Sequence, residues 1–144
     1  MGRIKIDLPK EFSFACKIPL RITDINYGGH AGNDSVLGII HEARMQYLKN
    51  FDLSELKFDG VGLIMTDVAI EFKSELFYGD TIIASVQADE FSDIGFAIFY
   101  KLEKKTTEGN KVAAIARTGM LCYNYEKKKI AKIPGEAKDQ LSTD

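Results

Sequence analysis

The sequence predicts an α+β fold in which an antiparallel sheet wraps around one long central helix. Three observations support this fold class. Residues 36–51 are mostly apolar helix formers without proline, which is typical of a buried helix. An extended apolar segment precedes them, and long segments rich in β-branched and aromatic residues follow, as expected of strands. Short turn-like connections between the later segments favour antiparallel pairing.

The first predicted strand covers residues 12–22, "FSFACKIPLRI", in which Pro19 indicates an edge or a bulge. A glycine-rich loop, "YGGHAGND" at 27–34, separates this strand from the helix. Asn33, Asp34 and Ser35 are favourable N-cap residues, so the helix is expected to begin near Val36.

The predicted helix is apolar on nearly every side and is therefore expected to be mostly buried. Its one polar line contains Glu42, Gln46 and Lys49, at i, i+4 and i+7. One reading of this line is a wet face of the helix; the other is that Glu42 performs chemistry.

Four further strands are predicted at 63–76, 81–91, 94–105 and 110–129, with turn signals between them. We expect them to form an antiparallel meander. In the strand at 94–105, Phe96, Ile98 and Tyr100 share one face, whereas Ala97 and Phe99 share the other. Because one helix covers only one face of a sheet, the second face is expected to meet another subunit.

Composition limits the classes of function. A chain of 144 residues with 45% hydrophobic residues reads as a single domain over 1–144 with a sizeable core. The net charge of -2 gives no reason to expect nucleic acid. No apolar run could cross a bilayer and the first residues lack the apolar middle of a signal peptide, so a cytoplasmic protein without membrane association is expected. No metal site is expected, and Cys16 and Cys122 read as buried apolar residues.

Residues 21–48, "RITDINYGGHAGNDSVLGIIHEARMQYL", carry a family pattern. They resemble the hotdog-fold acyl thioesterases, in particular the 4-hydroxybenzoyl-CoA thioesterase-like and acyl-ACP thioesterase-like group. That pattern reads D-x-D-x-x-G-H-x-x-N, followed by an apolar helix with E-x-x-R or E-A-R. It is matched by Asp24, Gly29, His30, Asn33, Glu42 and Arg44. The later "SELFYGDTI" is similar to a strand-turn-strand of the same proteins.

The resemblance implies a hotdog fold and hydrolysis of acyl-CoA or acyl-ACP thioesters, with the coenzyme A thioester as substrate and no cofactor. It also implies a homodimer or a homotetramer with the site at the subunit interface. The chain departs from the pattern at its second acidic position, where many members carry a catalytic aspartate and this chain has Asn26.

The glycine-rich loop has a physical reading of its own. A helix N-terminus presents unpaired backbone N–H groups, which can form an oxyanion hole for a thioester carbonyl. Gly28, Gly29 and Gly32 would let substrate approach the backbone closely, and with Asn33 and Asp34 they form the predicted substrate-binding set. The alternative is a flexible loop that only caps the helix.

The catalytic candidates are Glu42, His30, Asp24 and Asn26. Glu42 or His30 would activate water, and replacing either by alanine is expected to lower hydrolysis at least about tenfold. Asp24 would orient His30 or, by preference, cap the loop, and Asn26 would donate a hydrogen bond to substrate or within the turn. Arg44 is expected to pair with an acid across an interface.

The predicted function is acyl thioester hydrolysis. The alternative is a protein of the same fold that binds acyl thioesters without turning them over, and Asn26 is the feature that favours it. A dehydratase is the third possibility.

Overall fold

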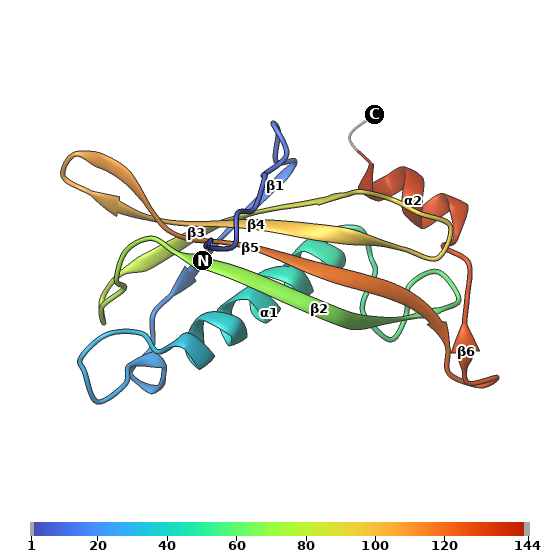
Figure 1. Ribbon diagram of the computed structural model, residues 1–144, viewed down its shortest axis with the longest axis horizontal. Helices are drawn as coiled ribbons and strands as arrows, with labels where there is room; N and C mark the ends of the chain where they lie inside the picture. The colour runs from blue at the N-terminus through green and yellow to red at the C-terminus, as the bar shows by residue number, and fades with distance from the viewer. Residues whose placement is uncertain (1, 143–144) are drawn as a thin grey trace.

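The computed structural model describes residues 2–142 and consists of one antiparallel sheet and two α-helices (Figure 1). The strands are β1 (Phe14–Pro19), β2 (Gly62–Phe72), β3 (Thr81–Asp89), β4 (Gly95–Thr106), β5 (Gly109–Asn124) and β6 (Lys129–Ile130). The helices are α1 (Asn33–Lys49) and α2 (Gly135–Leu141), with a short 3-10 turn η1 (Ile22–Asp24). The strand order is β1-β3-β4-β5-β2, and β6 pairs with β5.

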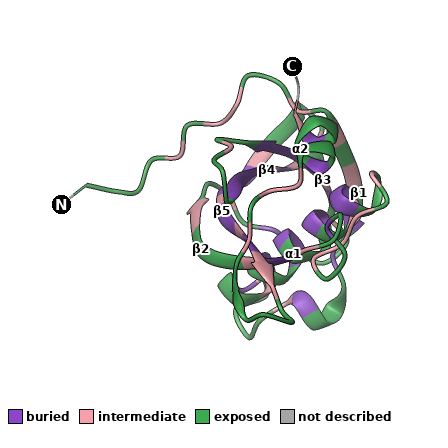
Figure 2. Cartoon of the chain, turned by 90° about the vertical axis from the view of Figure 1, so that its right-hand side faces the viewer, coloured by how far each residue is buried: buried purple, intermediate pink, exposed green. Residues whose placement is uncertain are grey.

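Helix α1 lies in the hollow of the curved sheet, so the predicted sheet around a long helix is confirmed (Figure 2). Ile40, Ala43, Tyr47 and Leu48 on α1 have no exposed surface. The backbone N–H of Ala88 in β3 donates a 3.1 Å hydrogen bond to the Tyr47 hydroxyl. Burial raises the pKa of Tyr47 to about 12, so this hydroxyl remains neutral and ties α1 to the sheet.

The start of α1 differs from the prediction. The helix begins at Asn33, and Gly32 is its N-cap, with extended backbone angles and no side-chain hydrogen bond. Gly32 takes this place because its carbonyl accepts the first helical bond, from the N–H of Val36 at 3.0 Å. Leu37 and Met45 are 38% and 37% exposed. The helix is therefore open along one stripe, which agrees with reading Glu42, Gln46 and Lys49 as a wet face and also exposes part of Leu37 and Met45.

The predicted four-strand meander is wrong for its first strand. β3, β4 and β5 are consecutive neighbours, but β2 pairs with β5 and lies at the far edge of the sheet. β2 ends at Phe72 and not at Leu76, which leaves residues 73–80 as a connection. A connection of this length can cross from one edge of a sheet to the other, whereas a tight hairpin turn cannot. It crosses beside the start of α1, where it helps to form a cavity.

The outer face of β4 is covered within the single chain. Ala97 and Phe99 are only 1% and 2% exposed. The Arg117 guanidinium lies 5.9 Å from the centre of the Phe99 ring, and it is paired with Glu90 at 2.8 Å and Asp67 at 3.2 Å. The two apolar faces of this strand therefore give no reason to require a second subunit.

The sheet instead exposes apolar side chains along β2, an edge strand that pairs only with β5 among the described residues. Met65, Val68 and Phe72 are 38%, 38% and 52% exposed. Main-chain groups on an open edge can pair with another strand. The edge of β2 therefore carries exposed apolar side chains beside main-chain groups that have no strand partner among the described residues.

Three elements were not predicted: η1, α2 and β6, since the strand predicted over 110–129 ends at Asn124 and a turn precedes β6. The carbonyl of Leu141 in α2 accepts a 3.1 Å bond from Gln87 Nε2, and Gln87 Oε1 accepts a 2.8 Å bond from the N–H of Ser13. Gln87 therefore joins the residue before β1 and the end of α2 to β3. Cys122 is buried, Cys16 is half-buried, and neither forms a disulfide. Within residues 2–142, no helix is long and apolar enough to span a bilayer.

Candidate functional site

The glycine-rich loop is folded into a turn by its own backbone hydrogen bonds. The N–H of Asn26 donates to the carbonyl of His30 at 2.9 Å, and the N–H of Gly29 donates to the carbonyl of Asn26 at 3.1 Å. Gly29 has φ +86°, a left-handed conformation that other residues adopt only with strain. Ile25 and Ala31 form a β-bridge that closes the loop.

The side chain of Asn26 is engaged in this turn. Its Oδ1 accepts a 2.9 Å bond from the N–H of Gly28, the arrangement in which an asparagine side chain caps its own turn. A Cβ added to Gly28 would lie 3.2 Å from Asn26 Oδ1 and 3.5 Å from His30 Nε2. The absence of a side chain at Gly28 therefore leaves room for both groups.

The first turn of α1 has uncovered backbone amides. The N–H of Ala31 donates to the carbonyl of Leu76 at 2.8 Å, and the N–H of Gly32 makes a long 3.4 Å contact with the carbonyl of Asp24. Among residues 2–142, the N–H groups of Asn33, Asp34 and Ser35 have no hydrogen-bond partner. These donors lie at the end of the helix where its dipole favours negative charge.

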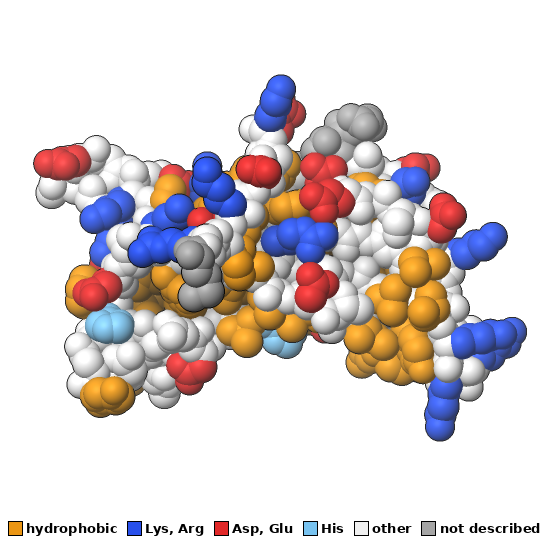
Figure 3. Space-filling model, viewed as in Figure 1, with side chains coloured by type: hydrophobic (Ala, Val, Ile, Leu, Met, Phe, Trp, Pro, Cys, Tyr) orange, Lys and Arg blue, Asp and Glu red, His pale blue; other side chains and the backbone are white. Residues whose placement is uncertain are grey.

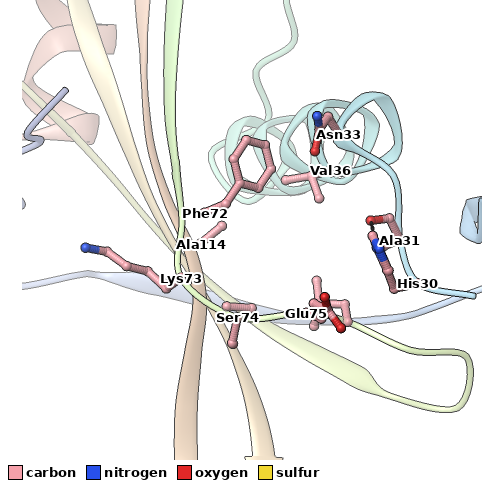
Figure 4. Close-up of a pocket in the computed structure, with 11 residues that line it drawn as sticks. His30, Ala31, Asn33, Val36, Phe72, Lys73, Ser74, Glu75 and Ala114 are labelled. Atoms are coloured by element: carbon pink, nitrogen blue, oxygen red, sulfur yellow. Dashed lines mark hydrogen bonds between the residues drawn. The ribbon is translucent and has the colours of Figure 1, made fainter. Parts of the chain in front are cut away.

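A cavity of about 270 Å³ adjoins the first of these residues, Asn33 (Figure 4). Asp34 is outside its lining, and Ser35 lines a separate groove. One wall comes from the loop and the start of α1, and the other from the end of β2 and the connection to β3. Its lining is His30, Ala31, Asn33, Val36, Phe72, Lys73, Ser74, Glu75, Leu76, Ala113 and Ala114. The size is near the lower end of small-molecule sites, and the floor is apolar.

His30 is the predicted catalytic residue that faces this cavity. Its Nδ1 lies 3.2 Å from the carbonyl oxygen of Ala31, which favours the tautomer with the proton on Nδ1. Nε2 has no recorded partner within residues 2–142. The ring can therefore accept a hydrogen bond from a molecule in the cavity.

Glu42 does not share this cavity. It lies on the open stripe of α1, in a separate groove of about 430 Å³ between α1 and β1. Its Oε2 accepts a 2.8 Å bond from Gln46. Cys16 of β1 is close enough for the charge of Glu42 to add to burial in raising the pKa of the thiol. The structure thus separates the two groups that the sequence placed in one site.

Asp24 lines the same groove as Glu42 and is buried. Its Oδ2 accepts a 2.9 Å bond from the N–H of Arg21 and lies 3.6 Å from Arg21 Nε. These bonds cap η1. In the described chain, no contact joins the Asp24 carboxylate to His30, so the geometry gives Asp24 a structural place beneath the loop.

Asp34 and Gly32 meet at the helix start. Asp34 Oδ1 would lie 2.7 Å from a Cβ on Gly32, so a larger residue there would displace the carboxylate. Of the predicted substrate-binding residues, Asn33 lines the cavity itself, whereas Gly28, Gly29 and Gly32 shape the loop beside it.

Arg44 pairs inside its own chain rather than across an interface. Its Nε donates to Glu55 Oε1 at 2.8 Å and its Nη1 to the Tyr100 hydroxyl at 3.3 Å. Tyr100 in turn bonds Thr118 at 2.7 Å. Burial raises the pKa of Tyr100, so its hydroxyl is neutral. Within this network the positive charge of Arg44 is therefore paired with the Glu55 carboxylate.

Sequence reasoning missed the opposite wall, which is formed by Phe72, Lys73, Ser74 and Glu75. These residues were assigned to a strand, and no local pattern says that the chain crosses beside the helix there. The bond from Ala31 to Leu76 that joins the two walls links residues 45 positions apart and has no counterpart in local sequence.

The fold and the site together define a class: proteins in which an antiparallel sheet encloses a helix whose first residue lines a small cavity. Residues 20–141 match the sequence model of the Thioesterase-like superfamily, and the chain belongs to that family. The fold is the hotdog fold, as the resemblance implied. No curated protein matches the sequence.

Solved structures agree on the fold. A thioesterase superfamily protein from Jannaschia sp. CCS1 has a TM-score of 0.82 at 14% identity, covering 94% of this chain and 84% of that one. A 4-hydroxybenzoyl CoA thioesterase mutant complexed with 4-hydroxybenzoyl CoA has a TM-score of 0.80 at 14% identity, covering 90% and 98%. A 1,4-dihydroxy-2-naphthoyl-CoA thioesterase from Synechocystis has a TM-score of 0.78 at 19% identity, covering 89% and 93%. The family supports thioester hydrolysis in general, and these neighbours support the fold.

Proposed function

We propose that the protein hydrolyses acyl thioesters of coenzyme A in the cavity at the start of α1. The observation that carries the proposal is the unpaired N–H of Asn33, the first residue of α1, which lines the cavity. Donors of this kind stabilise the oxygen of a thioester as it becomes negative, and the loss of one costs on the order of 10²–10³ in rate.

The reaction follows from this geometry. The thioester oxygen accepts hydrogen bonds from the helix amides while the acyl group packs on Val36, Phe72 and Leu76. A water molecule donates a hydrogen bond to Nε2 of His30, and its oxygen adds to the carbonyl carbon of the thioester. The C–S bond then breaks, and the products are a carboxylic acid and a thiol. Only the thioester and water are required.

Coenzyme A suits the charge distribution near the cavity. Lys73 lines the cavity and Lys104 lies beside the connection after β2, 2.7 Å from the carbonyl of Glu75. Figure 3 shows one group of Lys and Arg side chains on the left half of the visible face, with others at its centre and right edge. Such a surface attracts the phosphates of coenzyme A. The neighbour complexed with 4-hydroxybenzoyl CoA supports the same class of ligand.

We propose a homodimer, or a tetramer built from dimers, joined along the open edge of β2. The exposed Met65, Val68 and Phe72 on this edge support the proposal. Because Phe72 also lines the cavity, a partner on this edge would lie close to the site. Sedimentation measurements on the wild type and on Val68→Asp would test it, since a buried aspartate at the interface should yield monomers.

The function is tested with purified protein and a panel of acetyl-, hexanoyl-, palmitoyl- and benzoyl-CoA, with thiol release followed over time. We expect catalytic release from at least one member. Binding of panel members without release would instead support the second candidate, a non-catalytic acyl-thioester binding protein. The engagement of Asn26 in the turn, where an acid is usual, favours that candidate.

A further inference from the structure

The proposed reaction needs a group that removes a proton from water, and the predicted carboxylates are poorly placed for it. Asn26 cannot act as a base, Asp24 caps η1, and Glu42 lies in a different groove. Asp34 lies over Gly32 and is outside the cavity lining. The cavity lining nevertheless contains one carboxylate, that of Glu75.

Glu75 is held in place through its backbone. The next residue, Leu76, is 3% exposed and accepts the N–H of Ala31 at 2.8 Å. The carbonyl of Glu75 itself accepts a 2.7 Å bond from Lys104 Nζ. The backbone around Glu75 is therefore bonded to Ala31, the residue that follows His30. Ala31 lies two positions before Asn33, whose N–H is unpaired.

The carboxylate of Glu75 is not engaged elsewhere. Within residues 2–142 it forms no hydrogen bond or ion pair, although nearby side chains do. Lys73 lies 3.5 Å from Glu71, and Lys104 lies 3.6 Å from Asp80. In Figure 4, Glu75 lies on the wall opposite the helix start, between Ser74 and His30 in this view. A free carboxylate in this position can bind water.

We propose that Glu75 is the general base of the thioesterase reaction; this inference rests on the proposed function. The attacking water donates one hydrogen to Nε2 of His30 and the other to the Glu75 carboxylate. As the water oxygen bonds to the carbonyl carbon, Glu75 accepts the second proton and the helix amides hold the oxyanion. The C–S bond then breaks, and the proton passes from Glu75 to the departing thiolate. Glu75 thus replaces the aspartate that Asn26 does not supply.

The test compares Glu75→Gln, Glu75→Asp and a control, Glu126→Gln, on the best-hydrolysed member of the acyl-CoA panel. Glu126 is an exposed residue in the connection between β5 and β6 and does not line the cavity. Because the Glu75 side chain bonds no other group, Glu75→Gln should keep the wild-type Tm and circular dichroism. We expect it to lower kcat by about 100-fold or more with KM nearly unchanged, a typical loss for a general base. Glu75→Asp should retain at least about tenfold more activity than Glu75→Gln, because it keeps a carboxylate.

Two results would overturn the role of Glu75: a Glu75→Gln enzyme within about threefold of the wild-type kcat, or a Glu75→Asp enzyme no better than Glu75→Gln. Either result leaves hydrolysis by the wild type intact and so spares the proposed function. The proposed function itself fails differently, through a wild-type protein that releases thiol from no member of the panel.

Discussion

The Nδ1 atom of His30 lies 3.2 Å from the carbonyl oxygen of Ala31. The N–H of Ala31 donates a hydrogen bond to the carbonyl of Leu76 on the other side of the cavity. The histidine ring is thus positioned by a residue that is itself anchored to the opposite wall. With the Nδ1 proton directed at this carbonyl, Nε2 is the nitrogen that can serve a molecule in the cavity.

Replacing His30 should therefore impair hydrolysis without unfolding the protein. We expect His30→Ala to lower kcat at least about tenfold, because the attacking water loses an acceptor. His41→Ala is the matched control, since His41 lies on the exposed side of α1 and contacts Glu55 at 3.3 Å. Steady-state rates on the acyl-CoA panel decide the matter, and equal rates in both variants would remove His30 from the mechanism.

The position of Glu42 changes what its replacement should do. The sequence led us to expect a large loss of activity for Glu42→Ala. In the structure Glu42 bonds Gln46 and faces the groove beside β1, so we expect a loss smaller than about threefold. A tenfold loss in the same assay would mean that the thioester lies along that groove. The cavity at His30 would then not be the site of the reaction.

The sequence alone was sufficient for the fold class, the central helix and the candidate loop, because each depends on local pattern. The apolar periodicity over α1, the glycine cluster before it and the alternating strands after it are all visible within short windows. The pairing of β2 with β5 was not visible. It depends on where the chain crosses after Phe72, and residues 73–80 carry no signal that distinguishes a crossing from a strand end.

The same limit applies to the site. His30 and Asn33 were recognised because they lie in the family pattern, whereas Glu75 is brought to them by the bond from Ala31 to Leu76. The separation of Glu42 from His30 depends on the rotation of α1 about its axis. Buried residues of α1, among them Ile39 and Ala43, fix that rotation. Which residues do so emerges only from the packing of the helix against the whole sheet.

Two glycines near the site should respond to alanine in opposite ways. Gly29 has φ +86°, so Gly29→Ala should destabilise the fold by about 1 kcal/mol. Gly38 lies inside α1, where an added Cβ meets no atom within 4 Å, so Gly38→Ala should stabilise it by about 0.5–1 kcal/mol. Urea unfolding of both variants measures the difference, and equal midpoints would contradict the conformation of the turn.

Cys122 should resist thiol reagents in the native protein. Burial raises its pKa to about 11, so at pH 8 only about 0.1% is thiolate, the reactive form. Labelling should therefore accelerate as the pH rises and become rapid on unfolding. Mass spectrometry of the native protein after treatment with a thiol reagent at pH 8 provides the check. Rapid modification of Cys122 would contradict the burial of its side chain in β5.

The most direct test of the account concerns one N–H group, that of Asn33. Asn33 is the first residue of α1 and follows a Gly32 in extended conformation, so proline is tolerated there and removes only an unpaired donor. Asn33→Ala is the matched control, because it removes the side chain and keeps the N–H. Steady-state hydrolysis of acyl-CoA by the two variants, at equal Tm, is the decisive measurement. We predict that Asn33→Pro has a kcat on the order of 10²–10³ below that of Asn33→Ala; equal kcat values would contradict the proposal that the opening amides of α1 bind the thioester oxygen.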